Sequence, residues 1–246
     1  RSYEPRRAID TEPIKDVVHY FEEYDLPVMP ITNKYGVLLG RITSDDIYDI
    51  INEHATEQMY NLAGVNDEAE EDEEILKAGK TRAIWLSVNL FTAISASLVI
   101  GLFSQTINSM VALAILMPIV ASMGGNAGTQ SLTVVVRQLA LGEIDSRDAI
   151  RIIKKEVIIA LLNGGLFAVI IGVIAAIWFH MKMLGVVIGL SMIINLFMAG
   201  FFGATIPLAL KKMNIDPAIG STVILTTVTD VVGFFSFLGL ATLILL

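Results

Sequence analysis

Long uncharged stretches constrain this chain more than any other feature of its sequence. Residues 83–136 contain no Asp, Glu, Lys or Arg, residues 157–210 contain only Lys182, and residues 217–246 contain only Asp230. About 20 apolar residues are needed for a helix to cross a bilayer. The stretches therefore predict a predominantly α-helical membrane protein with five spans. The predicted spans cover about 83–104, 109–138, 152–179, 184–210 and 217–245.

Basic residues flank these spans almost entirely on one side, where ten Lys or Arg stand against Lys182 alone on the other. Because short loops rich in Lys and Arg stay in the cytoplasm, we expect a multi-pass protein of the plasma (inner) membrane. Its N-terminal part would be cytoplasmic and Leu246 outside. The ten residues are Lys77, Lys80, Arg82, Arg137, Arg147, Arg151, Lys154, Lys155, Lys211 and Lys212.

Composition excludes several classes of function. Residues 1–76 hold 19 acidic and 6 basic residues, a balance that argues against nucleic-acid binding and fits a soluble part that meets cations. The chain has no Cys, so it has no disulfide and no thiolate metal site. The three histidines are isolated and none begins the H-E-x-x-H pattern of a metalloprotease. We therefore expect a protein that is not an enzyme.

The first sixty residues have the pattern of a small α/β part. Residues 14–24 are amphipathic with helical spacing, and residues 26–31 and 37–42 read as strands around an Asn-Lys-Tyr-Gly turn. Thr43 or Ser44 then caps a helix that runs to about Asn61. We assign residues 67–82, which begin with a run of carboxylates, to a linker before the first span.

Acidic side chains line one face of the helix after Thr43, since they recur every four residues. No Lys or Arg lies between residues 42 and 76 to offset the repulsion. Divalent cations such as Mg²⁺, held largely through water, would neutralise this face; the alternative is an exposed, solvated face. The acidic residues are Asp45, Asp49, Glu53 and Glu57, with Asp46 beside them, and a separate apolar stripe holds Ile47, Ile51, Ala55 and Met59.

Polar residues also interrupt the second span. Asn126, Thr129 and Gln130 follow Gly124 and Gly125 within an apolar segment. Gly124 and Gly128 form a G-x-x-x-G pattern that packing alone explains. Packing does not require the amides and the hydroxyl, whose oxygens could receive the water shell of a cation.

The last span places Thr222, Thr226 and Asp230 on one face, at intervals of four residues. A carboxylate at membrane depth costs roughly 2.5–3.5 kcal/mol and marks a functional site by default. We take Asp230 as the single acid within the spans. With backbone carbonyls freed on the same face it would form a hard-oxygen cation site, and in a symmetric dimer two copies could meet across a central pore. The alternative is a protonated Asp230 hydrogen-bonded to a helix.

Two segments resemble known families. Residues 40–46, with Thr43 and Asp46, resemble a CBS motif, which implies contacts with an adenine nucleotide such as ATP; the alternative is that they only cap the helix. CBS motifs work in pairs, so a mate is expected upstream. The run PIVASMGGNAGTQSLTVVVRQLALGEI (118–144), with the CBS-type front and Asp230, is similar to the MgtE family of magnesium channels.

The MgtE resemblance implies a homodimer in the lipid bilayer, with a pore on the two-fold axis and hydrated Mg²⁺ held at Asp230. Gly125, Asn126 and Thr129 match the family's pore-side positions. It also implies that cytoplasmic Mg²⁺ closes the channel at Asp25, Asp46, Asp49 and Glu57. The implied domains are a partial CBS domain (1–43), an acidic plug helix (44–66), the linker (67–82) and a pore domain (83–246).

Two other functions compete with a channel. An ion-coupled secondary transporter of divalent cations would need inverted repeats or coupling carboxylates, and a single intramembrane acid argues against it. A membrane-anchored nucleotide sensor would explain the CBS-type segment and leave Asp230 and Asn126 without a role.

Overall fold

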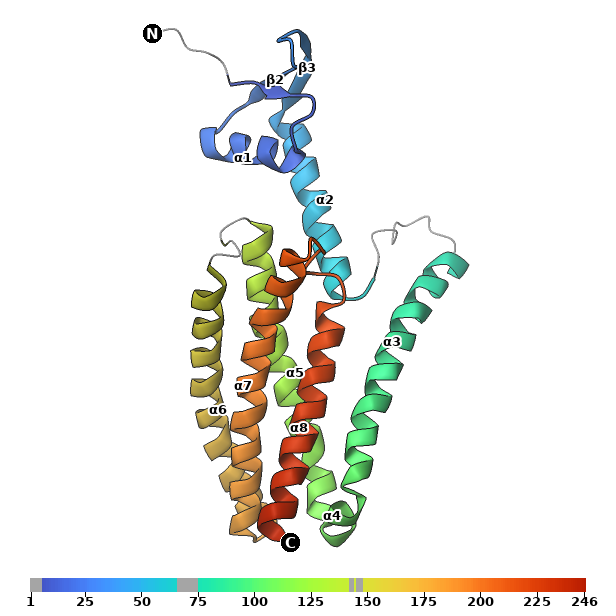
Figure 1. The fold of residues 1–246 in the computed structure, drawn as a ribbon, viewed down its shortest axis with the longest axis vertical. Coiled ribbons are helices and arrows are strands. Elements are labelled where there is room, and N and C mark those ends of the chain that lie inside the picture. Colours follow the sequence, from blue (N-terminus) through green and yellow to red (C-terminus); the bar gives the residue numbers. More distant parts are fainter. Residues whose placement is uncertain (1–5, 66–74, 142–143, 145–147) are drawn as a thin grey trace. The chain divides into compact units, whose positions relative to one another are not determined.

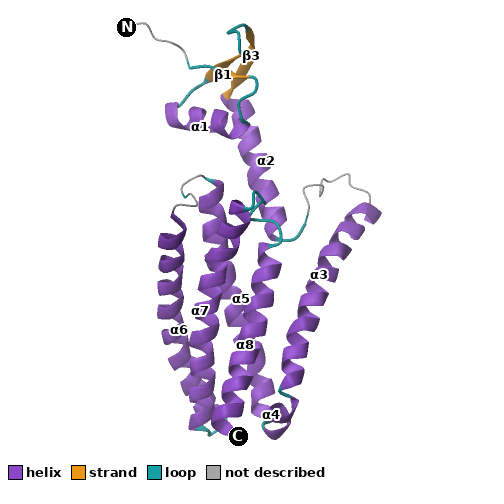
Figure 2. Cartoon of the chain, in the orientation of Figure 1, coloured by secondary structure: helices purple, strands orange, loops and turns teal. Residues whose placement is uncertain are grey.

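The computed structural model describes residues 6–65, 75–141, 144 and 148–246 (Figure 1). The chain divides into two compact units, the first ending at Tyr60 and the second beginning at Asn61. The first is a small α/β unit and the second is helical (Figure 2). Arg147 and the whole acidic run at the start of the predicted linker, Asp67 to Glu74, lie outside the described residues.

The first unit contains β1 (Ala8–Ile9), α1 (Ile14–Tyr24), β2 (Val28–Thr32), β3 (Leu38–Thr43) and most of α2 (Ser44–Leu62). Its sheet has the order β1-β2-β3, with β1 parallel and β3 antiparallel to β2. The buried core consists of Ala8, Val17, Phe21, Met29 and Ile47.

Local chemistry explains these boundaries. Asp25 ends α1 in the left-handed conformation, with φ of 47°. The carboxamide oxygen of Asn33 accepts hydrogen bonds from the backbone N–H groups of Tyr35 and Val37 and so closes the turn between β2 and β3. The predicted helix, strands and turn are confirmed. The sequence did not predict β1, because two residues are too few to show a strand period.

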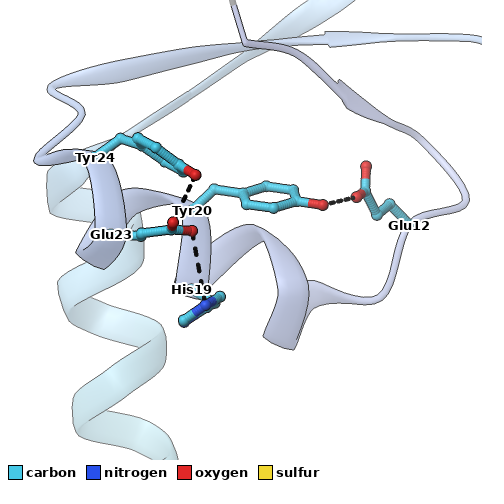
Figure 3. Close-up of polar contacts among 5 residues, drawn as sticks. All are labelled: Glu12, His19, Tyr20, Glu23 and Tyr24. Atoms are coloured by element: carbon cyan, nitrogen blue, oxygen red, sulfur yellow. Dashed lines mark hydrogen bonds and ion pairs between the residues drawn. The ribbon is translucent and has the colours of Figure 1, made fainter.

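Polar contacts tie α1 to the segment before it (Figure 3). The hydroxyl of Tyr20 donates to Glu12 Oε1 at 2.9 Å, and that bond raises the pKa of Tyr20. Tyr24 donates to Glu23, and His19 lies 3.8 Å from the same carboxylate (Figure 3). The guanidinium of Arg6 stacks 3.4 Å from the ring centre of Tyr24.

The second unit contains five helices that are long and apolar enough to cross a membrane. They are α3 (Ile75–Leu102), α5 (Val111–Ala140), α6 (Ala149–Trp178), α7 (Lys182–Lys212) and α8 (Ser221–Leu245), with the short α4 (Ser104–Ser109) after α3. The five predicted spans are therefore confirmed. The helix α3 begins at Ile75, within the segment that we assigned to the linker, because Leu76, Lys77 and Ala78 are good helix formers.

The chain passes back and forth through this unit, so that α3, α6 and α8 begin at the end where α5 and α7 finish (Figure 1). The opposite end holds α4 and the C-terminus. There Thr106 and Thr242 share a hydrogen bond of 2.8 Å between their hydroxyl oxygens, and Phe103 meets Phe235 edge to face.

The centre of the unit is α7, which packs against α5, α6 and α8. In the most apolar 18-residue stretch of α7, 61% of the residues are buried. The corresponding share for α3 is 6%. Glycines allow the close approach of α6 and α7: a Cβ atom on Gly185 would collide with the carbonyl oxygen of Gly172, and one on Gly189 would lie 3.1 Å from that of Ala168. Small residues at contacts are the usual means of helix packing in a bilayer.

Candidate cation site

The helix α5 has a packed face and an open face where its polar residues cluster. Gly124 and Gly128 are buried, and a Cβ atom on Gly128 would lie 3.0 Å from Leu225 of α8. Gly125 lies on the other side, where a Cβ atom would meet nothing within 4 Å. The glycine pair of the G-x-x-x-G pattern therefore packs helices together, whereas Gly125 leaves space free.

Asn126 and Thr129 lie on the open face of α5, and both side chains are exposed. Asn126 Nδ2 donates a hydrogen bond of 3.3 Å to Ser122 Oγ, one turn earlier. This bond leaves the carboxamide oxygen of Asn126 available. The side-chain oxygens predicted for cation binding on α5 are thus accessible from outside the single chain.

The helix α8 has the same division. Thr229 and Gly233 belong to its buried face, whereas Thr222, Thr226 and Asp230 lie partly exposed beside it. The buried face consists of Ser221, Leu225, Thr229, Gly233, Phe237, Leu238 and Ala241. The predicted polar line is therefore a separate face of α8.

Asp230 makes no hydrogen bond or ion pair with any residue that the structure describes, and its side chain is only partly buried. The alternative that we considered, a carboxyl hydrogen-bonded to a helix, therefore has no partner within the described part of one chain. A free carboxylate facing lipid would be costly. Water, a cation or a second subunit must meet it instead.

The expectation of freed backbone carbonyls near Asp230 is wrong. The helix α8 is continuous from Ser221 to Leu245, so its carbonyls are used within the helix. The hydroxyl of Thr226 donates to the carbonyl oxygens of Thr222 and Val223, at 3.0 and 3.1 Å. The oxygens that this face could offer to a cation are therefore those of its side chains.

A small pocket of about 150 Å³ gathers two of the predicted residues with residues that the sequence did not single out. Thr222 and Thr226 line it together with Trp85 and Asn89 of α3. The hydroxyl of Thr222 donates to the carbonyl oxygen of Leu62, the last residue of α2, at 3.0 Å. Gly125, Asn126, Thr129 and Asp230 are not among its lining residues.

Comparisons with known proteins identify the family of the chain. Residues 117–240 match the MgtE family, described as a divalent cation transporter family. The chain belongs to the MgtE family. The matched segment takes in most of α5, all of α6 and α7, and α8 as far as Leu240. It therefore includes the predicted cation-site residues Gly125, Asn126, Thr129, Thr222, Thr226 and Asp230.

Curated MgtE relatives match nearly the whole chain. It is 32% identical over 239 residues to the magnesium transporter MgtE of Bacillus subtilis and 33% identical over 229 residues to that of Enterococcus faecalis. These alignments cover 96% and 93% of this chain and 53% and 50% of the relatives. The chain thus spans about half the length of the curated relatives that it matches. With five apolar helices, this MgtE-family chain is a multi-pass membrane protein.

The acidic residues predicted as regulatory lie in the first unit. Asp45, Asp46, Asp49 and Glu53 are exposed on α2, and Glu57 is partly exposed. Asp25 is exposed at the end of α1. Within the described residues no group of three or more Asp, Glu or His is close enough to hold a metal ion. The described part of one chain therefore presents exposed acidic residues without a formed metal site.

The apolar stripe predicted on α2 is only partly right. Ile47 is buried in the core of the first unit, with Ile50 and Ile51 packed against it, but Met59 is 64% exposed. The apolar stripe continues beyond the residues that cover it, because the small core of this unit reaches only the first two turns of α2.

Thr43 and Asp46 bind one another. Asp46 Oδ2 accepts hydrogen bonds from the hydroxyl of Thr43 at 2.7 Å and from its backbone N–H at 2.8 Å. The hydroxyl bond, followed by the backbone bond, holds the pKa of Asp46 below its ordinary value of 3.8. This is half of a capping box at the start of α2. The two residues proposed for nucleotide binding therefore have a structural role already.

Two buried polar residues in the second unit were missed from the sequence. Glu156 on α6 is only 7% exposed and accepts a hydrogen bond of 2.7 Å from Ser131 Oγ on α5. The assignment of a single intramembrane acid is therefore wrong: Glu156 lies inside a span, immediately before the uncharged stretch that begins at residue 157. Asn195 on α7 is fully buried. For Asn195 the available signal was a single polar residue within an apolar run, whereas Glu156 directly follows Lys154 and Lys155 and gave no such signal.

Proposed function

We propose that this chain forms a Mg²⁺-selective channel that imports magnesium across the plasma membrane. The pore would lie at a homodimer interface lined by the open faces of α5 and α8. Hydrated Mg²⁺ would be held by Asp230 with Thr226, Thr222, Asn126, Gly125 and Thr129 along the pathway. The relatives named as magnesium transporters support the choice of ion.

The unpartnered carboxylate of Asp230 carries this proposal. It lies on a partly exposed face of α8, one turn beyond Thr226 and two turns beyond Thr222 on the same line of the helix. Polar residues within a span avoid lipid and face a water-filled cavity or a protein partner. A second copy of the chain, placed about a two-fold axis, would present the same face and enclose an aqueous path. Oxygen ligands that keep most of the ion's water suit Mg²⁺, which dehydrates reluctantly.

Regulation would come from the first unit. We propose that cytoplasmic Mg²⁺ binds the acidic surface formed by Asp25, Asp45, Asp46, Asp49, Glu53 and Glu57 and stabilises a closed state. Mg²⁺ can shift the population only by its difference in affinity between the two states. The hydrogen bond from Thr222 to the carbonyl of Leu62 supports this scheme, because it joins the end of α2 to a residue of the proposed pathway. ATP would bind where a paired CBS motif completes the site.

Flux measurements on liposomes carrying the protein test the pathway. With an imposed membrane potential, the native chain should show saturating Mg²⁺ influx, and Asp230→Asn should abolish it, because the neutral amide keeps the size but loses the charge that holds the cation. The dimer, measured by cross-linking, should persist. Influx that survives Asp230→Asn would remove this residue from the pathway and the proposed pore with it.

A second candidate, an ion-coupled transporter of divalent cations, is favoured by Glu156. This carboxyl is buried between α5 and α6 and could carry a coupled proton. The channel proposal expects Glu156→Gln, which keeps an oxygen to accept from Ser131, to preserve Mg²⁺ influx driven by voltage alone. Influx in the native chain that requires a proton gradient, and loses that requirement in Glu156→Gln, would establish the transporter instead.

A further inference from the structure

Asn195 occupies the junction of three helices in the second unit. It lies on α7 and is fully buried. Its Nδ2 donates a hydrogen bond of 2.8 Å to the carbonyl oxygen of Val120 on α5. Its Oδ1 is buried and has no hydrogen-bond partner among the described residues. A buried polar atom without a partner costs free energy, so a carboxamide here requires a reason.

Two glycines make the space for this carboxamide. A Cβ atom on Gly124 of α5 would collide with both the Nδ2 and the Oδ1 of Asn195. A Cβ atom on Gly233 of α8 would lie 2.8 Å from Nδ2. The carboxamide therefore fills a notch that exists only because α5 and α8 both lack a side chain there, and it touches both helices at once.

The notch lies beside the candidate cation site on both helices. Gly124 directly precedes Gly125 and Asn126 on α5, and Gly233 follows Asp230 by three residues, which is less than one turn of α8. The contacts of Gly124 and Gly233 with Asn195 therefore lie within about one helical turn of Asn126 on α5 and of Asp230 on α8. A rigid contact at one position of a helix fixes the position of the side chains around it, because protein interiors are close-packed.

We infer that Asn195 is a positioning residue for cation selectivity: it fixes the separation of α5 and α8 at the level of Asp230 and so sets how closely the site fits its hydrated ion. This inference rests on the proposed function. An apolar side chain of similar volume would fill the notch without burying an unpaired oxygen, but it would lack the hydrogen bond that locks α7 to the carbonyl of Val120.

The test compares Asn195→Leu with Asn163→Leu in the whole chain in liposomes. Asn163 lies on α6 with its side chain exposed, so its replacement changes polarity within a span but touches no notch. In Asn195→Leu we expect the Mg²⁺ concentration for half-maximal influx to rise by roughly five- to tenfold, a typical size for coupling between two parts of one protein. We also expect weaker discrimination against Ca²⁺, with maximal influx reduced much less. Asn163→Leu should change neither.

If Asn195→Leu fails to assemble, two variants at Gly124 and Asn195 test the same role. Gly124→Ala alone should disrupt the bundle, and Gly124→Ala combined with Asn195→Ala should restore assembly because the collision is removed. A restored protein with a raised half-maximal concentration supports positioning by the hydrogen bond. A restored protein with native affinity and selectivity overturns it, since the carboxamide would then only fill space.

The same experiments separate this inference from the proposed function. If Asp230→Asn abolishes influx and Asn195→Leu leaves affinity and selectivity native, the pathway stands and the role of Asn195 is refuted. If Asp230→Asn leaves influx intact, the site is not on the pathway and the role of Asn195 falls with it.

Discussion

The packed and open faces of α5 and α8 both contain small and polar residues, but these residues have different surroundings. On the packed faces, Gly124, Gly128 and Gly233 allow helices to touch, and Ser131 pairs with a buried carboxylate. On the open faces, Asn126 and Asp230 have the same kinds of polar atom but reach no other helix among the described residues. Small and polar residues in a span therefore serve either helix packing or an aqueous path. Which role a residue has depends on the face of the helix on which it lies.

This comparison has an energetic basis. Between helices in lipid there is no hydrophobic driving force, so close van der Waals contact and interhelical hydrogen bonds hold the bundle. Groups used for those contacts cannot bind a hydrated ion. Groups left over are too costly to face lipid, and they identify the surface that water or a second subunit covers.

The largest expected effect is on the packed side, at Gly203 of α7. A Cβ atom there would lie 2.8 Å from the carbonyl oxygen of Gly128 and 2.9 Å from the Cβ of Ser131, so α5 and α7 must separate. We expect Gly203→Ala to destabilise the protein by about 1–3 kcal/mol, measured by thermal unfolding in detergent. Gly165→Ala is the control, because its Cβ atom meets nothing within 4 Å. Equal melting temperatures for the two variants would contradict the distinction between the faces.

A smaller effect, on transport and not on stability, is expected on the open side. Thr129→Ala removes an exposed hydroxyl of α5, so the free energy of unfolding should change by less than about 0.5 kcal/mol. The Mg²⁺ concentration for half-maximal influx should rise, because an oxygen that receives the ion's water shell is lost. Ser97→Ala on α3, whose exposed hydroxyl bonds its own helix at Ala93, serves as the control. A destabilised Thr129→Ala with native influx would reverse the assignment of the face.

The smallest effect extends the comparison to α2, where Asp46 and Asp49 are both exposed but Asp46 accepts hydrogen bonds from Thr43. Because the folded-state pKa of Asp46 lies below its ordinary value of 3.8, the stability it contributes is fully present above that value. It is lost as the pH falls through the lower, folded-state pKa. Hydrogen exchange of residues 41–50, measured in the whole chain, should therefore speed up at low pH more in the native protein than in Asp46→Asn. Matching pH profiles would show that the cap contributes nothing.

The sequence determined much of this protein. Absence of charge over three long stretches was sufficient for five spans, since only a helix satisfies its own backbone in lipid. The turn residues Asn33 and Gly36 and the cap at Thr43 gave the strand and helix order of the first unit. Periodicity also placed Thr222, Thr226 and Asp230 on one face of α8, because spacing by four residues is a property of the helix itself.

Only the tertiary structure decided which polar residues pack and which remain open. In the sequence, Gly124 and Gly125 are indistinguishable neighbours, yet the first receives the carboxamide of Asn195 and the second faces free space. Glu156 reads as a residue near a span end, yet it is buried against Ser131. The reason is physical. The hydropathy of a segment shows only whether it can lie in lipid. Which side chains a polar residue contacts depends on how neighbouring helices pack, and that packing is set by residues far apart in the chain.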